Sequence, residues 1–271
     1  MPTLVVASRA FVCPAGGAPP ATFAYEQRLI AAAEGAGWSV LAADVDQVPA
    51  TVPEPAVYVT TDCAVATAEA LDLALLEPSF DLLTRVPDRF LRRQVEAATF
   101  GDLDRLQGRT FVKPADPLDK WFDAGVYADV RDIRTHGHSR PDAPVLLSEP
   151  VEWSVELRYF VLEGKAVAGS PYISHGRPAW RWHANQPSAV PVAGLAVVEG
   201  VCAAMAGELP PAFVLDVGRI DDRGWAAVEF NPVWSAGLLD ADPRAILPAL
   251  LRVTRDRSAL TADESRWDLR R

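Results

Sequence analysis

The twenty residues from Phe213 to Pro232, FVLDVGRIDDRGWAAVEFNP, constrain what this chain can fold into more than any other stretch. Two runs rich in β-forming residues, Phe213–Ile220 and Trp225–Phe230, flank the turn-forming residues 221–224. Most of the other residues in both runs are apolar, which indicates that the strands are buried. The stretch therefore predicts a buried β-hairpin.

Three polar side chains of this hairpin are predicted to share one face. If the hairpin closes symmetrically about residues 222 and 223, Asp216 lies directly opposite Glu229, and Asn231 follows two residues later. Facing carboxylates repel each other and destabilise a sheet, but a hard divalent cation such as Mg²⁺ removes the repulsion and prefers oxygen ligands. The alternative is an exposed acidic face on a surface hairpin, and the hairpin alone does not decide between the two.

Composition excludes several classes of protein. At 271 residues the chain is long enough for one large domain or for two or three joined subdomains. A net charge of −10 without a basic run argues against a nucleic-acid partner. No apolar stretch approaches the roughly 20 residues that span a bilayer, and the N-terminus has no basic leader. We therefore expect a cytoplasmic protein, in which Cys13, Cys63 and Cys202 are reduced thiols.

Strands and helices alternate over roughly the first 80 residues. The expected strands are Thr3–Ser8, Trp38–Ala43 and Ala56–Thr60, and the expected helices are Tyr25–Glu34 and a segment from Asp62 to about Leu76. Such alternation is typical of a small, mostly parallel α/β unit. The loop Arg9–Pro20 carries no glycine motif for phosphate binding, so no nucleotide site is expected in this unit.

The remaining elements follow in a mixed order. We expect a helix after Pro87 that carries Arg89, Arg92 and Arg93, then strands at Thr110–Val112, Val126–Ile133, Val145–Ser148, Val155–Val161 and Ala166–Gly169, and helices at Leu195–Glu208 and Pro243–Thr254. Alternation along Val155–Val161 places Glu156 and Arg158 on the same face. Pro150 interrupts the preceding strand and leaves backbone polar groups of the linker unpaired.

Two polar or aromatic loops stay open in function. His136 and His138 could suggest a metal site, but no further ligand stands at a suitable spacing, so a solvated loop is favoured. The segment Trp180–His183 either forms a substrate rim or folds its aromatic rings onto the core.

Lysine is scarce in this chain. Only three of the 26 basic residues are lysines, namely Lys113, Lys120 and Lys165. Because arginine is used by default, a lysine suggests that a compact ammonium is needed at its position. Lys113 and Lys120 lie close together in one strand end and its following loop.

In three motifs the chain resembles the ATP-grasp superfamily. They are FVKPA, LLSEPVEWSVELRYFVLEGKAV and VLDVGRIDDRGWAAVEFNP, which occur in the family's order between about Arg85 and Asp242. The resemblance implies an α+β ATP-grasp fold, in which two subdomains clasp ATP, preceded by a small Rossmann-like α/β domain. The implied domains are residues 1–85, then an N-terminal lid subdomain at 86–148, and a C-terminal subdomain with the metal site at 149–271.

The resemblance also implies roles for individual residues. Lys113, with Lys120 and an arginine of the helix ahead of it, would bind the ATP phosphates. Arg158 would contact the transferring phosphoryl group. The nucleoside would be held by Glu149 and the Val151 backbone at adenine and by Glu156 at the ribose, and Mg²⁺ by Asp216, Glu229 and Asn231.

Two departures from the family pattern matter. Many relatives have a second phosphate-binding lysine on the helix before FVKP, where this chain offers only Arg89, Arg92 and Arg93; Arg92 is our choice, with Arg93 as its alternative. Many ligases also carry an arginine two positions before the metal-binding aspartate, where this chain has Val214. That role would then fall to Arg158 or Arg219.

The implied function is an ATP-dependent carboxylate–amine ligase that acts through an acyl-phosphate and releases ADP. Its substrates would be a small-molecule carboxylate and an amine, or a peptide, selected by loops at Arg9–Pro20, Pro171–Pro191 and Trp234–Asp242. The alternatives are an ATP-grasp kinase that phosphorylates a small molecule and an ATP-binding regulatory module without chemistry. Formation of a homodimer is left open.

Overall fold

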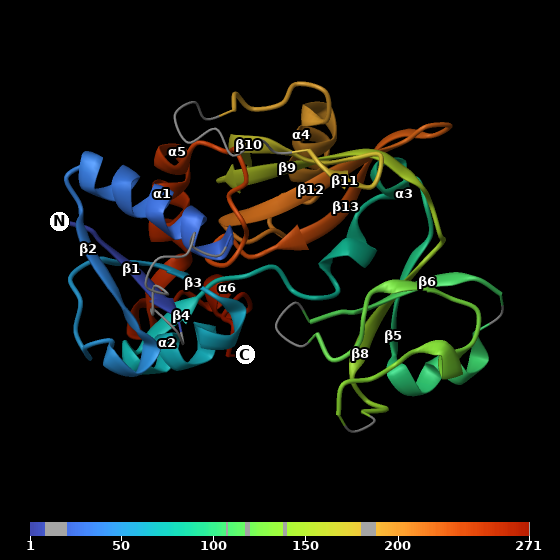
Figure 1. Ribbon diagram of the computed structural model, residues 1–271, viewed down its shortest axis with the longest axis horizontal. Helices are drawn as coiled ribbons and strands as arrows, with labels where there is room; N and C mark the ends of the chain where they lie inside the picture. The colour runs from blue at the N-terminus through green and yellow to red at the C-terminus, as the bar shows by residue number, and fades with distance from the viewer. Residues whose placement is uncertain (9–20, 107, 117–119, 138–139, 180–187, 271) are drawn as a thin grey trace.

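The computed structural model describes residues 1–8, 21–106, 108–116, 120–137, 140–179 and 188–270. Within these ranges the chain forms three principal sheets, which follow one another along the sequence (Figure 1). The loop Arg9–Pro20, His138 and the segment Trp180–His183 lie outside the described residues. No helix in the described ranges is long and apolar enough to cross a membrane.

The first sheet is parallel, as the sequence predicts. Its strands β1 (Thr3–Ser8), β2 (Ser39–Asp44) and β3 (Pro55–Val59) are ordered β2-β1-β3, with helices α1 (Ala21–Gly35) and α2 (Ala64–Ala70) beside them. The predicted extension of the second helix to Leu76 is wrong. Asp72 adopts a left-handed φ of 51°, which ends the helical path, and residues Leu73–Leu75 form strand β4 against β14 (Thr254–Asp256).

The second sheet is antiparallel and carries the predicted hairpin. It contains β9 (Trp153–Leu162), β10 (Lys165–Ser174), β11 (Arg177–Pro178), β12 (Ala212–Ile220) and β13 (Gly224–Asn231) in the order β11-β10-β9-β12-β13. The predicted alternation of β9 is confirmed, because Leu157, Tyr159 and Val161 share a core with helix α4 (Leu195–Ala204). That helix ends four residues before the predicted end at Glu208.

One apolar core joins the first sheet to the opposite face of the second. Phe160 of β9 belongs to it, together with helix α5 (Pro243–Val253) and the fully buried Trp234 that follows β13. Helix α5 begins where predicted because the Asp242 side chain accepts from the Arg244 amide and Pro243 occupies the first turn. The parallel sheet is thereby fixed against the sheet that carries the hairpin.

The third sheet projects from the rest of the molecule, at the lower right of Figure 1. Its strands β5 (Val95–Thr99), β6 (Thr110–Pro114), β7 (Gly125–Tyr127) and β8 (Pro144–Ser148) are ordered β5-β8-β6-β7 around their own small core. The strand predicted over Val126–Ile133 stops at Tyr127, and a 3₁₀ turn capped by Asp129 takes the rest. Strand β5 is not predicted from the sequence.

The helix predicted after Pro87 is short. Helix α3 (Asp88–Leu91) ends where Arg92 adopts a left-handed φ of 51°, a conformation that costs energy for a residue with a Cβ. Arg89 is therefore helical, whereas Arg92 and Arg93 lie in the turn that leads to β5. A further short helix, α6 (Ala262–Ser265), is held by a capping box between Thr261 and Glu264 near the C-terminus.

Candidate functional site

The β12–β13 hairpin places its two carboxylates opposite each other, as predicted, but by a different route. The turn has three residues, because Ile220 pairs with Gly224, and this register alone would put Asp216 opposite Val228. A β-bulge shifts the register by one residue between Val217 and Asp216, so that Asp216 pairs with Glu229. Without the bulge, the side chains beyond it would have faced the opposite side of the sheet.

Asp216 is fully buried and held by Arg158 of the neighbouring strand. The two residues are direct cross-strand partners, and Arg158 donates from Nε to Oδ1 at 2.9 Å and from Nη2 to Oδ2 at 2.7 Å. Such a two-point contact is the strongest geometry for this type of ion pair. Burial alone would lower the pKa of Arg158, but the facing Asp216 carboxylate outweighs it and raises the pKa.

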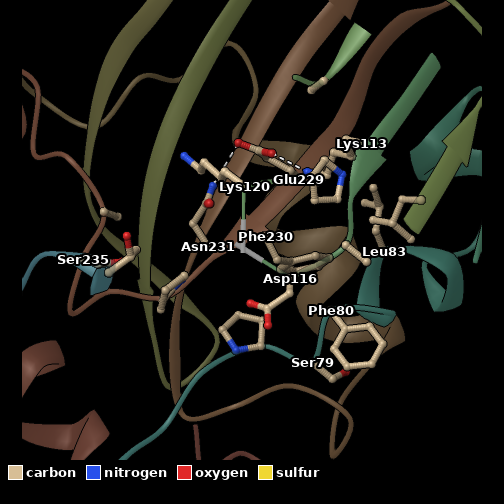
Figure 2. Close-up of a pocket in the computed structure, with 18 of the residues that line it drawn as sticks. Ser79, Phe80, Leu83, Lys113, Asp116, Lys120, Glu229, Phe230, Asn231 and Ser235 are labelled. Atoms are coloured by element: carbon tan, nitrogen blue, oxygen red, sulfur yellow. Dashed lines mark hydrogen bonds and ion pairs between the residues drawn. The ribbon is translucent and has the colours of Figure 1, made fainter. Parts of the chain in front are cut away.

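Glu229 is held in turn by Lys113, which reaches it from the end of β6 in the third sheet. The Lys113 Nζ lies 2.6 Å from Glu229 Oε2, and Asn231 Nδ2 donates to Glu229 Oε1 at 3.1 Å (Figure 2). Burial would raise the pKa of Glu229, but the Lys113 charge and these hydrogen bonds lower it to about 2. Arginine and lysine, rather than a metal ion, thus relieve the repulsion of the facing carboxylates here.

A cavity of about 430 Å³ opens beside these ion pairs. Its walls come from the turn after β4, from the loop after β6, and from strands β9, β10 and β13 with the segment that follows. Figure 2 shows Lys113, Lys120 and Asp116 on the side of the third sheet, facing Glu229, Asn231 and Ser235. Arg158 and Tyr172 also line this cavity, so most of the predicted phosphate ligands meet in it.

A second, smaller cavity of about 140 Å³ lies between the second and third sheets. It is lined by Glu149 and Val151, the residues predicted to hold adenine, and by Arg93 and Trp153. Lys113 and Glu229 line both cavities. The two cavities therefore meet at the Lys113–Glu229 ion pair.

Of the candidate arginines after Pro87, the structure brings Arg93 into the site. Arg93 lines the smaller cavity, donates to the Ala227 and Val228 carbonyls and lies over the Trp153 ring at 4.9 Å. Burial lowers its pKa to about 10. Arg92, the residue chosen from the sequence, lines neither cavity and donates to the Trp225 carbonyl instead. The sequence choice fails because the helix expected to present Arg92 ends before it.

Glu149 meets an arginine that sequence analysis missed. Arg223, at the tip of the hairpin turn, donates to both carboxylate oxygens at 3.0 and 2.7 Å and also to the Arg92 carbonyl. This contact lowers the pKa of Glu149. Each carboxylate oxygen retains a second lone pair, so Glu149 could still accept a further hydrogen bond. No sequence signal pairs a turn arginine with a linker glutamate 74 residues away.

Glu156 lies on the same face as Arg158 but lines neither cavity. Burial, with the nearby Asp216 and Glu229 charges, raises its pKa to about 7. Its cross-strand partner is Gly218, and a Cβ there would stand 2.3 Å from the Trp153 ring. Glycine at this position is therefore what lets Trp153 pack beneath the hairpin and beside the smaller cavity.

Tyr172 is a second site residue that the sequence did not reveal. The register between β10 and β9 shifts between Pro171 and Ile173, and Tyr172 is the extra residue of this bulge. Its ring packs under the Arg158 guanidinium at 4.6 Å from ring centre to Cζ. A bulge that redirects a side chain is not visible in a strand pattern, although the proline beside it is a signal of irregularity.

The oxygen ligands predicted for Mg²⁺ converge but are already engaged. Among the described residues, no group of three or more His, Cys, Asp or Glu side chains forms a metal-binding cluster. The predicted set instead combines Asp216 and Glu229 with the Asn231 amide, whose Nδ2 lies 3.3 and 3.1 Å from the two carboxylates. Oxygen donors of this kind fit Mg²⁺, provided that Asn231 turns its amide and the basic partners give up lone pairs.

Solved structures with the same overall arrangement are ATP-grasp proteins. D-cycloserine synthetase DcsG superposes with a TM-score of 0.56 at 13% identity, covering 92% of this chain and 98% of that one. D-alanine–D-alanine ligase from Bacillus anthracis, complexed with ATP, gives a TM-score of 0.48 at 11% identity, covering 93% and 97%. At these identities the DcsG likeness shows the fold alone, and a search of curated proteins finds no match.

The sequence itself matches the model of a known family. This family is an ATP-grasp domain, the second family of its clade, and its model aligns with residues 90–249. The aligned span includes both ion pairs, the hairpin and the strands that line the two cavities. Because the match covers more than half of the chain, the chain belongs to this ATP-grasp domain family.

Proposed function

We propose that this protein is an ATP-dependent carboxylate–amine ligase that works through an acyl-phosphate and releases ADP and phosphate. The observation that carries the proposal is the junction of the two cavities at Lys113 and Glu229. A nucleoside in the smaller cavity would have to send its phosphates past this pair into the larger one. The larger cavity has room for a small carboxylate beside the terminal phosphate. DcsG, a synthetase by its printed name, shares the fold and is consistent with this proposal.

The nucleoside end is assigned to the smaller cavity. There Glu149 would accept from the adenine amino group, and the Val151 backbone, next to Pro150, would pair with the ring edge. Glu156 would bind the ribose, although it does not line the cavity and would have to be reached at its edge. These assignments keep residues 86–148 as the lid subdomain, 149–271 as the C-terminal subdomain and 1–85 as the domain before them.

The phosphate end is assigned to the basic residues around the junction. Lys113 and Arg93 line the smaller cavity, and Lys120 and Arg158 line the larger one, so the four cations would follow the triphosphate. Asp216, Glu229 and Asn231 would hold Mg²⁺, which when bound supplies positive charge at the phosphate oxygens. To act on the substrate, Arg158 must share its guanidinium between Asp216 and the cavity.

The chemistry would then proceed in two displacements. A carboxylate oxygen of the substrate bonds to the γ-phosphorus as the bond to the ADP oxygen breaks, which gives an acyl-phosphate. The amine nitrogen next bonds to the acyl carbon, phosphate departs with the electrons of the carbon–oxygen bond, and the amine loses its proton. In the first step Lys113 and Arg158 stabilise charge that shifts toward the bridging and terminal oxygens.

Trapping the acyl-phosphate tests this function. With ATP, Mg²⁺ and a panel of small carboxylates, added hydroxylamine should give a hydroxamate and one ADP for each product formed. A phosphorylated alcohol without hydroxamate would identify a kinase, and no ADP at all would indicate an ATP-binding module without chemistry. Release of AMP and pyrophosphate would mean adenylation and would refute the proposed mechanism.

A further inference from the structure

The larger cavity has two chemically different walls. One wall is polar and charged, with Arg158, Asn231 and Ser235. The other is formed by residues 78–83, the turn after β4, and presents Pro78, Phe80 and Leu83. Figure 2 shows Ser79, Phe80 and Leu83 together at the edge of the cavity, away from Glu229 and Asn231. A ligand that fills this cavity must therefore match a charged side and an apolar side.

Phe80 is the most informative residue of the apolar wall. It is 45% exposed, and it is the one aromatic residue among the large hydrophobic side chains that the described part of the chain leaves exposed. Leaving so much aromatic surface in water is unfavourable unless a ligand or partner covers it. Because this surface lies at the mouth of the proposed active site, the substrate is the ligand that would cover it.

The turn that carries Phe80 is rigid. Arg85 donates from Nη2 to the Ser79 hydroxyl at 2.6 Å, and the Leu82 amide donates to the Ser79 carbonyl at 3.0 Å. Leu82 and Leu83 are buried in the core beneath the second sheet. The Phe80 ring is therefore presented from a fixed support, and a ligand that covers it would lose little free energy in ordering the turn.

We propose that the carboxylate substrate bears an apolar side chain close to its carboxylate, as in leucine, phenylalanine or a peptide that ends in one, and that Phe80 contacts this side chain. This inference rests on the ligase function proposed above. The carboxylate must lie near the terminal phosphate at Lys113 and Arg158, so the apolar part extends toward the turn at 78–83. Phe80 is then a residue that selects the acyl donor without taking part in phosphoryl transfer.

Calorimetry with matched ligands tests the assignment apart from turnover. L-leucine, L-serine and glycine are titrated into the protein with Mg²⁺ and a non-hydrolysable ATP analogue, and the same amino acids serve as acyl donors in the hydroxamate assay. We expect leucine to bind more tightly than serine or glycine. Phe80→Ala should weaken leucine binding about three- to tenfold, the change expected when half of a Phe side chain is no longer covered.

Two controls separate selection from general damage. Phe80→Ala should leave glycine binding and ATP affinity unchanged, and Val65→Ala, which removes an exposed apolar side chain from helix α2, should change none of these values. An equal loss for glycine and leucine, or a preference for serine, overturns the inference. An effect on the KM of the amine alone would overturn the assignment to the acyl donor.

The failure of this inference differs from the failure of the proposed function. Turnover of carboxylates without a Phe80-dependent preference refutes the inference and leaves the ligase intact. Phe80-dependent binding of leucine without hydroxamate or ADP refutes the ligase and leaves the binding site. If no member of the panel binds or reacts, both are refuted.

Discussion

Removal of Arg158 should destabilise the protein through the carboxylate that it leaves behind. Asp216 has no exposed surface, and both of its oxygens are held by Arg158 at 2.9 and 2.7 Å. Breaking a buried pair from one side costs about 3–5 kcal/mol, because the remaining charge is unpaired. Asp216 can avoid that state by taking up a proton. From an ordinary pKa near 3.9, this costs about 4 kcal/mol at pH 7, so Arg158→Ala should lose roughly 3–4 kcal/mol there.

The same argument gives the loss a pH dependence. Without Arg158, nothing opposes the burial that raises the pKa of Asp216, so in the variant the folded-state pKa lies well above the unfolded-state value. A group with a raised pKa contributes stability that is present at low pH and is lost as the pH rises through its folded-state pKa. The loss should therefore shrink to about 1.5 kcal/mol at pH 5, where protonating an ordinary aspartate costs that amount.

Urea unfolding at pH 5 and pH 7, without nucleotide and with a chelator, measures both values. The double variant Arg158→Ala/Asp216→Asn should recover part of the loss at pH 7, because it removes the buried charge. Arg131→Ala breaks the exposed Asp129–Arg131 pair and serves as control, with an expected change below about 1 kcal/mol. If Arg158→Ala costs under 1 kcal/mol at both pH values, Asp216 is not a buried partner of Arg158 and the reasoning fails.

Four further outcomes are expected. Glu229→Gln should abolish ATP turnover with Mg²⁺ and, because it breaks the Lys113 pair, should also lower the unfolding free energy by about 1–2 kcal/mol in urea melts; full turnover would refute the metal assignment. ATP should bind at least roughly tenfold more tightly than GTP in calorimetry, because Glu149 would face the guanine carbonyl at a cost of about 1–3 kcal/mol; equal binding would misplace the adenine site. The pKa of Glu156 is raised to about 7, so its protonated form stabilises the fold below that pH and the contribution is lost as the pH rises; Glu156→Gln should remove about 2 kcal/mol of the difference in unfolding free energy between pH 5.5 and pH 8. Lys113→Met should let the nucleotide-free protein bind Mn²⁺ at least several-fold more tightly in calorimetry, because Glu229 loses its bound cation; unchanged affinity would show that Lys113 does not occupy the cation position.

The sequence predicts the site best where one local pattern decides the geometry. Strand alternation correctly places Glu156 and Arg158 on one face of β9, and the turn residues between β12 and β13 correctly predict their hairpin. The pairing of Asp216 with Glu229 is confirmed, but the reason given for it is only half right. The three-residue turn and the bulge each shift the register by one residue relative to the symmetric hairpin, and the two shifts cancel.

Contacts between distant segments are where sequence reasoning stops. Arg223 reaches Glu149 across the gap between two sheets, and nothing local to either residue indicates it. Arg93 enters the site instead of Arg92 because the helix ends one residue earlier, at a left-handed Arg92. Helix ends depend on tertiary contacts as much as on propensity, and an error of one residue changes which side chain enters a cavity.

The charges of the site balance before any ligand arrives, and this balance constrains how ligands can bind. Lys113 is paired with Glu229 and Arg158 with Asp216, so each cation proposed to bind phosphate neutralises a carboxylate proposed to bind metal. A divalent cation alone would have to enter beside two resident cations, and a triphosphate alone would have to enter beside two carboxylates. When both enter together, each basic residue exchanges a carboxylate for a phosphate and each carboxylate exchanges a basic residue for the metal. The number of favourable charge contacts then rises without leaving any buried charge unpaired, which favours the entry of ATP and Mg²⁺ as one complex.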